Sequence, residues 1–173
     1  NRLFTDKESA FQDYATAQTL RKLYEMKLGI PCIDSICDPA DKETKADSLE
    51  EIRECIRIAG NLHIPGIRVH AKSHGEDDVA TVQEFLTEVL PEAEAAGLTL
   101  LFETSGLFCD TAKLRDMLEH FACDSLAALW DLYSPYFIAN EKPEKTIENL
   151  GAYVKHIHVK DAIKTADGTK FCL

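Results

Sequence analysis

The chain has 173 residues, of which 45% are hydrophobic and 28% are charged, and this is the composition of a globular protein with one sizeable core. Its formal net charge is −11 and no Lys/Arg cluster appears, whereas nucleic-acid-binding proteins depend on a basic face, so no nucleic-acid partner is expected. No apolar run approaches the roughly 20 residues that cross a bilayer, so no membrane partner is expected either.

The cysteine pattern bears on the cellular compartment. The chain has six cysteines, and none of them forms a Cys-x-x-Cys pair. A chain of this size can form a core without disulfides, so we interpret the cysteines as reduced thiols. The expected location is therefore the cytoplasm.

The first half of the chain predicts helices that alternate with short apolar strands. A helix is expected over residues 5–28, from a capping-box pattern at its start and an imperfect apolar stripe along it. A strand is expected over residues 30–37. Ser48 and Glu51 form a second capping box, which predicts the start of the next helix, and residues 67–71 follow as a strand.

The second half continues this alternation. A long apolar stripe predicts a helix over residues 79–97, with a kink at Pro91, and a strand over residues 98–103 follows it. Asp110 has the position of an N-cap for a further helix. The next strand is expected over residues 126–131.

The last predicted elements are a short helix from Pro143 through Leu150 and a strand over residues 154–158. Residues 165–173 are expected to form a glycine-containing turn. Five strands that alternate with helices imply an α/β protein with a parallel sheet and right-handed crossovers. Because five strands cannot close a barrel of eight, the pattern is compatible with an incomplete barrel or with an open sheet.

Three of the predicted strands end on side chains that can bind a metal, namely Glu103, Asp131 and His158. The first two are 28 residues apart and the last two are 27 apart, an interval that fits one strand, one helix and two loops. In a parallel β/α barrel the chemistry lies at the C-terminal ends of the strands. Carboxylate oxygens and an imidazole nitrogen at these ends suit one divalent ion, Mn²⁺, Mg²⁺, Co²⁺ or Zn²⁺.

Other polar residues near these strand ends are candidates for substrate binding. Arg68 and His70 alternate along one predicted strand, so they share a face on which a hydroxyl-rich or anionic substrate can bind. The same pattern is equally compatible with salt-bridged structural residues. Tyr133 shares the face of Asp131, and Lys160 follows the last predicted strand as a substrate-binding cation.

The chain resembles a known family at Leu100-Leu-Phe-Glu-Thr104, Leu129-Trp-Asp-Leu-Tyr133 and His156-Ile-His-Val-Lys-Asp161. These runs are similar to those of the xylose isomerase-like TIM barrels, the superfamily of sugar phosphate isomerases/epimerases. The resemblance covers nearly the whole chain and implies a (β/α)8 TIM barrel. Residues 1–173 are then expected to be a single partial domain of about five βα units, strands three to seven. The first βαβ unit and the last βα unit are expected to lie outside this sequence.

The resemblance also implies a function. In the family a Glu, an Asp and a His at the ends of strands five, six and seven bind one divalent metal, and these positions match Glu103, Asp131 and His158. The fourth ligand, a Glu on the eighth strand, is expected beyond Leu173. The implied activity is isomerisation or epimerisation of a sugar, sugar phosphate or polyol through a metal-stabilised enediolate, with a lyase or dehydratase as a related possibility.

Two positions depart from the family pattern. Family members often carry a His three residues after the metal Asp, where this chain has Ser134, and tagatose-type epimerases use a second Glu where this chain has Cys109. The catalytic acid/base is therefore unassigned. A non-catalytic sugar-binding or assembly module of the same fold remains an alternative, and an endonuclease IV-like DNA repair enzyme is disfavoured by the acidic charge. The sequence leaves a homo-oligomer open.

Overall fold

The computed structural model describes residues 10–165 and 168–172 of the chain. At its centre is a parallel sheet whose strands lie in the order β1-β2-β3-β4-β5, so that neighbours in sequence are neighbours in the sheet. The strands are β1 (Ile33–Asp34), β2 (Gly66–Val69), β3 (Thr99–Glu103), β4 (Leu126–Asp131) and β5 (Val154–His158). This order has no reversal point, unlike that of a doubly wound sheet, and is the order of consecutive strands in a β/α barrel.

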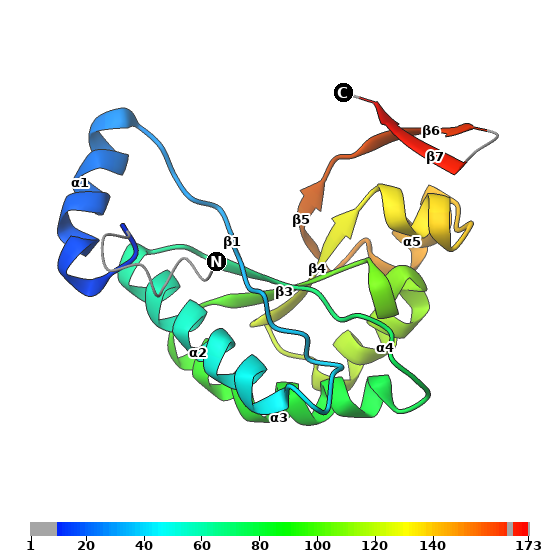
Figure 1. Ribbon diagram of the computed structural model, residues 1–173, viewed down its shortest axis with the longest axis horizontal. Coiled ribbons are helices and arrows are strands. Elements are labelled where there is room, and N and C mark those ends of the chain that lie inside the picture. Colours follow the sequence, from blue (N-terminus) through cyan, green and yellow to red (C-terminus); the bar gives the residue numbers. More distant parts are fainter. Residues whose placement is uncertain (1–9, 166–167, 173) are drawn as a thin grey trace.

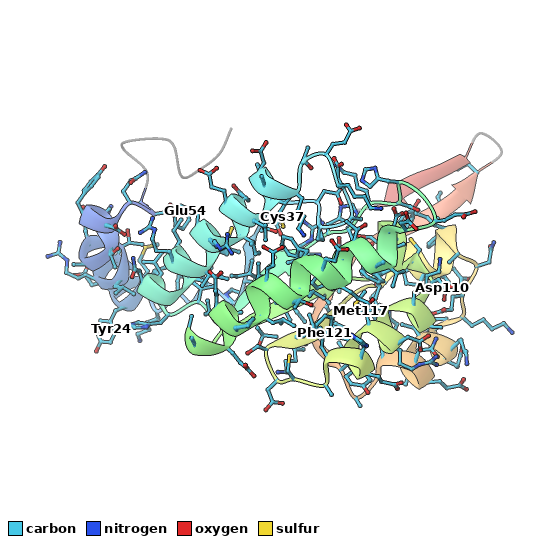
Figure 2. All side chains as sticks on the ribbon, turned by 90° about the horizontal axis from the view of Figure 1, so that it is seen from below. Tyr24, Cys37, Glu54, Asp110, Met117 and Phe121 are labelled. Carbon is cyan, nitrogen blue, oxygen red and sulfur yellow. The ribbon has the colours of Figure 1, made fainter. Side chains whose placement is uncertain are left out.

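A helix follows each of the first four strands, and α2, α3 and α4 lie together on one side of the sheet (Figure 1). The α-helices are α1 (Thr16–Met26), α2 (Lys45–Leu62), α3 (Asp78–Ala95), α4 (Thr111–Phe121) and α5 (Pro143–Leu150). Three shorter turns of helix are η1 (Asp13–Ala15), η2 (Gly106–Cys109) and η3 (Ser134–Ile138). From the helix side, Figure 2 shows α4 with Asp110 at its start and with Met117 and Phe121 along it.

Alternation along each strand gives the sheet two different faces. The face toward the helices forms the large core, in which Phe102 is fully buried. The opposite face carries a smaller cluster of buried residues, Leu101, Ala127 and Leu129, with Cys32 packed against it. Glu103 follows Leu101 by two residues and Asp131 follows Leu129 by two, so both carboxylates extend this second face beyond its apolar cluster.

The N-terminal elements are shorter than predicted. Of the helix predicted over residues 5–28, residues 5–9 lie outside the described part, and the remainder forms η1 and α1. The strand predicted over residues 30–37 is wrong in length, because only Ile33 and Asp34 pair with β2. The Ser35 amide adds one more backbone hydrogen bond, to the Arg68 carbonyl at 3.1 Å, so the apolar run was too weak a guide to the length of the strand.

The capping box predicted at Ser48 is also wrong. Helix α2 begins at Lys45, and Ser48 lies inside its first turn. The Ser48 hydroxyl is buried and bonds the backbone of Asp38 instead, accepting from its amide at 3.2 Å and donating to its carbonyl at 3.3 Å. Pro91 does not interrupt α3. The N-cap at Asp110 is confirmed, since its carboxylate accepts a hydrogen bond from the Ala112 amide.

The C-terminal part contains two features that the sequence did not predict. Two strands, β6 (Asp161–Thr165) and β7 (Gly168–Cys172), form an antiparallel hairpin where a turn was expected over residues 165–173. The hairpin projects away from the parallel sheet in Figure 1. Between β4 and β5 the register shifts by one residue, so that Ala128 pairs with Val154 but Leu129 pairs with His156. This bulge aligns Asp131 with His158.

The architecture therefore confirms the predicted α/β class with a parallel five-stranded sheet, and it fits a partial barrel of about five βα units. Among the described residues, no helix is long and apolar enough to cross a membrane.

Candidate functional site

Ionisable side chains from four neighbouring strands meet on the face of the sheet opposite the helices. Arg68 of β2 pairs in register with Leu101, Glu103 of β3 with Leu129, and Asp131 of β4 with His158 of β5. Because strands in register present the same face at each level, these four side chains lie at adjoining positions. Glu103, Asp131 and His158 are also the last residues of their strands. The sequence prediction that they lie at one edge of the sheet is thus confirmed.

Glu103 is the centre of this arrangement, with a side chain that is only 1% exposed. Its Oε2 atom accepts hydrogen bonds from Arg68 Nη2 at 2.6 Å and from Ser105 Oγ at 2.8 Å, and its Oε1 atom accepts one from His158 Nδ1 at 2.8 Å. Burial raises the pKa of Glu103, but these three donors outweigh it and bring the pKa down to about 2. Glu103 is therefore a carboxylate across the physiological pH range.

Asp131 is held in place through both its backbone and its side chain. Its backbone amide donates to Thr104 Oγ1 at 2.9 Å, which ties the end of β4 to the end of β3. Its fully buried carboxylate accepts from Ser134 Oγ at 2.5 Å and from the Tyr133 amide at 3.3 Å. Ser134, the residue that departs from the family pattern, thus positions the predicted metal ligand directly.

Lys160 brings Glu103 and Asp131 into one electrostatic group. Its Nζ atom lies 3.3 Å from Asp131 Oδ2 and 3.8 Å from Glu103 Oε1, while its side chain is 44% exposed. An ammonium group therefore lies between two carboxylates that are themselves almost inaccessible to water. Lys160 had been predicted to bind substrate, but in this structure its charge is directed at the predicted metal ligands.

The donor set fits a divalent ion in its chemistry. Two carboxylates and an imidazole are suitable ligands for Mn²⁺, Mg²⁺, Co²⁺ or Zn²⁺, and a positive charge already lies against both carboxylates. In the part of the chain that the structure describes, no three His, Cys, Asp or Glu side chains have the spacing of a formed metal site. The carboxylates of Glu103 and Asp131 are bridged by Lys160 instead.

Arg68 contacts two acids at once. Besides Glu103, its guanidinium reaches Asp34 Oδ2 through Nη1 at 3.2 Å, so it links β1 to β3 across β2. Its buried Nε atom is the one buried side-chain N or O atom of the described residues that lacks a hydrogen-bond partner. A buried donor without a partner carries a desolvation cost, and a ligand oxygen at this position would remove it.

His70 lies just beyond β2, against η2. Burial lowers the pKa of His70, and the positive charge of Arg68 acts in the same direction, so the imidazole is neutral at pH 7. A Cβ atom built on Gly106 would lie 2.9 Å from His70 Nε2 and 2.3 Å from the Ala71 carbonyl oxygen. Gly106 also has φ of +58°, so glycine is required here for both space and backbone conformation.

Tyr133 and Cys109 border the same site. The Tyr133 ring stacks on Phe137, with centroids 5.0 Å apart and an interplanar angle of 20°. Burial raises the pKa of the Cys109 thiol, and the negative charges of Asp131 and Glu103 raise it further. Cys109 is therefore a neutral thiol at the position where tagatose-type epimerases carry an acid/base carboxylate.

Sequence reasoning missed the hydrogen-bonded pair of Asp38 and His74, which lie in the loops that follow β1 and β2. His74 Nε2 lies 2.9 Å from the buried Asp38 carboxylate, which also accepts from the Lys72 amide at 3.1 Å and lies 3.6 Å from Lys72 Nζ. The hydrogen bond to Asp38 raises the pKa of His74. A polar cavity of about 440 Å³ lies beside His74, and Asp78 is among its lining residues. No local sequence signal joins Asp38 to His74, because they are 36 residues apart.

Solved structures with related folds match most of this chain. The xylose isomerase domain protein from Planctomyces limnophilus superposes with a TM-score of 0.78 at 18% identity, over 90% of this chain and 62% of that one. A D-tagatose 3-epimerase-like protein gives 0.73 at 16% identity, over 92% and 66%. A D-psicose 3-epimerase solved in the presence of D-fructose gives 0.72 at 13% identity, over 91% and 62%.

This chain thus spans about two thirds or less of the length of these three proteins. No curated protein matches the sequence. A family model described as "Xylose isomerase-like TIM barrel" matches residues 3–171, which is nearly the whole chain. The chain belongs to the xylose isomerase-like TIM barrel family.

Proposed function

We propose that this chain forms part of a divalent-metal-dependent isomerase or epimerase that acts on a sugar, sugar phosphate or polyol. The observation that carries the proposal is the convergence of Glu103, Asp131 and His158 at the C-terminal ends of three adjacent strands. The carboxylates of Glu103 and Asp131 are both buried, and each is paired with a cationic side chain. Buried acids paired in this way are typical of functional sites. The related folds of a D-tagatose 3-epimerase-like protein and of a D-psicose 3-epimerase support the substrate class.

Glu103, Asp131 and His158 are the proposed ligands of the ion. When bound, a divalent ion supplies Lewis-acid polarisation of a carbonyl oxygen, which favours proton loss from the neighbouring carbon. The neighbouring side chains hold the ligands: Ser134 donates to Asp131 and Arg68 donates to Glu103. Such outer contacts fix ligand orientation and are as important to a metal site as the ligands themselves.

Four residues are the proposed substrate contacts. Arg68 offers a donor without a partner and His70 offers a neutral imidazole, so both suit hydroxyl or carbonyl oxygens. Tyr133 presents an aromatic ring at the same strand end as Asp131, and Lys160 provides a partly exposed cation beside Asp131. Cys109 is not the proposed base, because its raised pKa keeps the thiol protonated at neutral pH.

The test is a comparison of Asp131→Asn with Asp116→Asn. Asp116 is an exposed aspartate of α4 that contacts Arg115, so its loss controls for the change of charge. We expect the whole enzyme of which this chain is proposed to be part, and its Asp116→Asn variant, to retain Mn²⁺ after gel filtration and to exchange the proton at C3 of a ketose with deuterium from D₂O. We expect Asp131→Asn to lose the ion and this exchange together. Metal retention by Asp131→Asn would exclude Asp131 as a ligand.

A second candidate is a non-catalytic sugar-binding module. It is supported by Cys109 and Ser134, which stand at two positions where the family resemblance leads one to expect a Glu and a His. Cys109 is a protonated thiol, and the Ser134 hydroxyl is directed at Asp131. Saturable ketose binding without any solvent deuterium incorporation, in the presence of Mn²⁺, would favour this candidate over the enzyme.

A further inference from the structure

The position of Lys160 between the predicted metal ligands has a consequence for how the site is loaded. We propose that Lys160 is an internal counter-cation that holds Glu103 and Asp131 in the metal-free protein, and that a divalent ion binds only when this ammonium group is displaced. The inference rests on the proposed metal site and extends it, because it assigns Lys160 a role in controlling metal affinity.

The atoms that hold Lys160 are the atoms that a metal needs. On Glu103, the Oε2 atom accepts hydrogen bonds from Arg68 and Ser105. The Oε1 atom accepts one from His158 Nδ1 and also faces Lys160 Nζ at 3.8 Å. On Asp131, the Oδ2 atom lies 3.3 Å from the same Nζ. An ion that coordinates these two oxygens would occupy the position of the ammonium group.

The charges of the site exclude simultaneous occupancy. Glu103 and Asp131 carry two negative charges, and Asp34, which also contacts Arg68, adds a third. Arg68 and Lys160 supply two positive charges in return. A divalent ion added to both cations would leave an excess of positive charge in a region where Glu103 and Asp131 are 1% and 0% exposed. Repulsion between like charges is strong where water is excluded, so one of the two cations must leave.

Lys160 is the cation that can leave. It belongs to the two-residue connection between β5 and β6, and its side chain is 44% exposed, so a change of rotamer returns the ammonium to water. Arg68 is 20% exposed and is held between Asp34 and Glu103. Once released, the Lys160 ammonium is available to an anionic or hydroxyl group of a substrate.

The test compares Lys160→Met with Lys155→Met in chelator-treated protein titrated with Mn²⁺ by calorimetry. Lys155 lies on β5, the strand that precedes Lys160, but its ammonium bonds the Asp124 carbonyl, so it controls for the loss of one charge. If Lys160 occupies the site in about nine molecules of ten, its removal tightens the apparent Mn²⁺ affinity by about tenfold. Lys155→Met should bind like the parent chain.

A second measurement uses the unmodified chain and so does not depend on whether the variant folds. Amines are labelled with an N-hydroxysuccinimide ester and each lysine is quantified by mass spectrometry. Mn²⁺ should increase labelling of Lys160 and leave that of Lys155 unchanged.

Unchanged or weaker Mn²⁺ binding by Lys160→Met, or Lys160 labelling that Mn²⁺ does not increase, would overturn the inference. The absence of any Mn²⁺ binding in parent and variant would overturn it together with metal dependence. Lys160-dependent Mn²⁺ binding without deuterium exchange into any ketose would instead support the inference and contradict only the proposed function.

Discussion

The strongest quantitative prediction concerns the contact of Arg68 with Glu103. The pKa of Glu103 falls from its ordinary 4.5 to about 2, although burial alone raises it. That difference corresponds to roughly 3 kcal/mol of stability at neutral pH. Arg68 donates the shortest hydrogen bond to Glu103, at 2.6 Å, so Arg68→Met is expected to lose most of this contribution. Leaving a buried carboxylate without its main partner costs about 3–5 kcal/mol.

The pH dependence follows from the direction of the shift. A carboxyl group whose pKa is lowered by folding binds more protons in the unfolded chain, so its stabilisation is present above pH 4.5 and is lost as the pH falls toward about 2. In Arg68→Met the pKa of Glu103 should rise. The deficit relative to the parent chain should therefore be largest near pH 7 and should shrink as the pH is lowered through 4.5.

The assay is urea unfolding followed by circular dichroism in metal-free buffer, at several pH values between 3 and 7, on Arg68→Met, Glu103→Gln and the double variant. Arg53→Met is the matched control, because Arg53 contacts Glu92 at 2.8 Å but both side chains are more than 40% exposed. Such exposed pairs contribute about 0–1 kcal/mol. A coupling between Arg68 and Glu103 no larger than that of the exposed pair would refute the reasoning.

Three further predictions follow from single contacts. Gly106→Ala should destabilise the fold by more than about 1 kcal/mol in thermal unfolding, since the added Cβ would lie 2.3 Å from a backbone carbonyl oxygen at a φ of +58°; unchanged stability would contradict this geometry. Asp38→Asn should lower the pKa of His74, which an imidazole NMR titration measures. Below that pKa the charged pair adds stability that is lost as the pH rises through it, and an unaltered titration would exclude the pair. Ser134→Ala should cost about 1–3 kcal/mol in urea unfolding, because the buried Asp131 carboxylate loses its 2.5 Å donor, whereas Ser134→Thr should retain most of it.

The strand ends were predictable from the sequence because a single local rule determines them. A buried strand reads as a short apolar run, and the first polar residue that can bind a metal at its end marks the edge of the sheet. Glu103 and Asp131 obey this rule, and the structure confirms that they share a face with His158. The even spacing of about one βα unit placed these residues at the ends of successive strands, but the pairing of Asp131 with His158 depends on the bulge between β4 and β5.

The partners of these residues could not be predicted, because they depend on tertiary contacts. Ser48 lies in a sequence pattern typical of a helix N-cap, but its buried hydroxyl forms hydrogen bonds with the Asp38 backbone instead. Lys160 was interpreted as facing substrate because nothing local indicates that its long side chain returns to Asp131. The β6–β7 hairpin was missed because its short strands carry no clear apolar alternation.

The one-residue bulge between β4 and β5 makes the site unusually sensitive to changes of chain length. Without it, Ile157 would pair with Asp131, and the His158 imidazole would fall one position beyond the end of the strand. Deletion of Lys155, the extra residue, would leave a regular ladder in which Asp131 still pairs with His158, whereas an insertion between Val154 and His158 would carry the imidazole past Asp131 while leaving every site residue present in the sequence. A relative could thus keep Glu103, Asp131 and His158 by alignment and still lack the site if an insertion shifted this register, so the chain length between Val154 and His158 is as informative as the residues themselves.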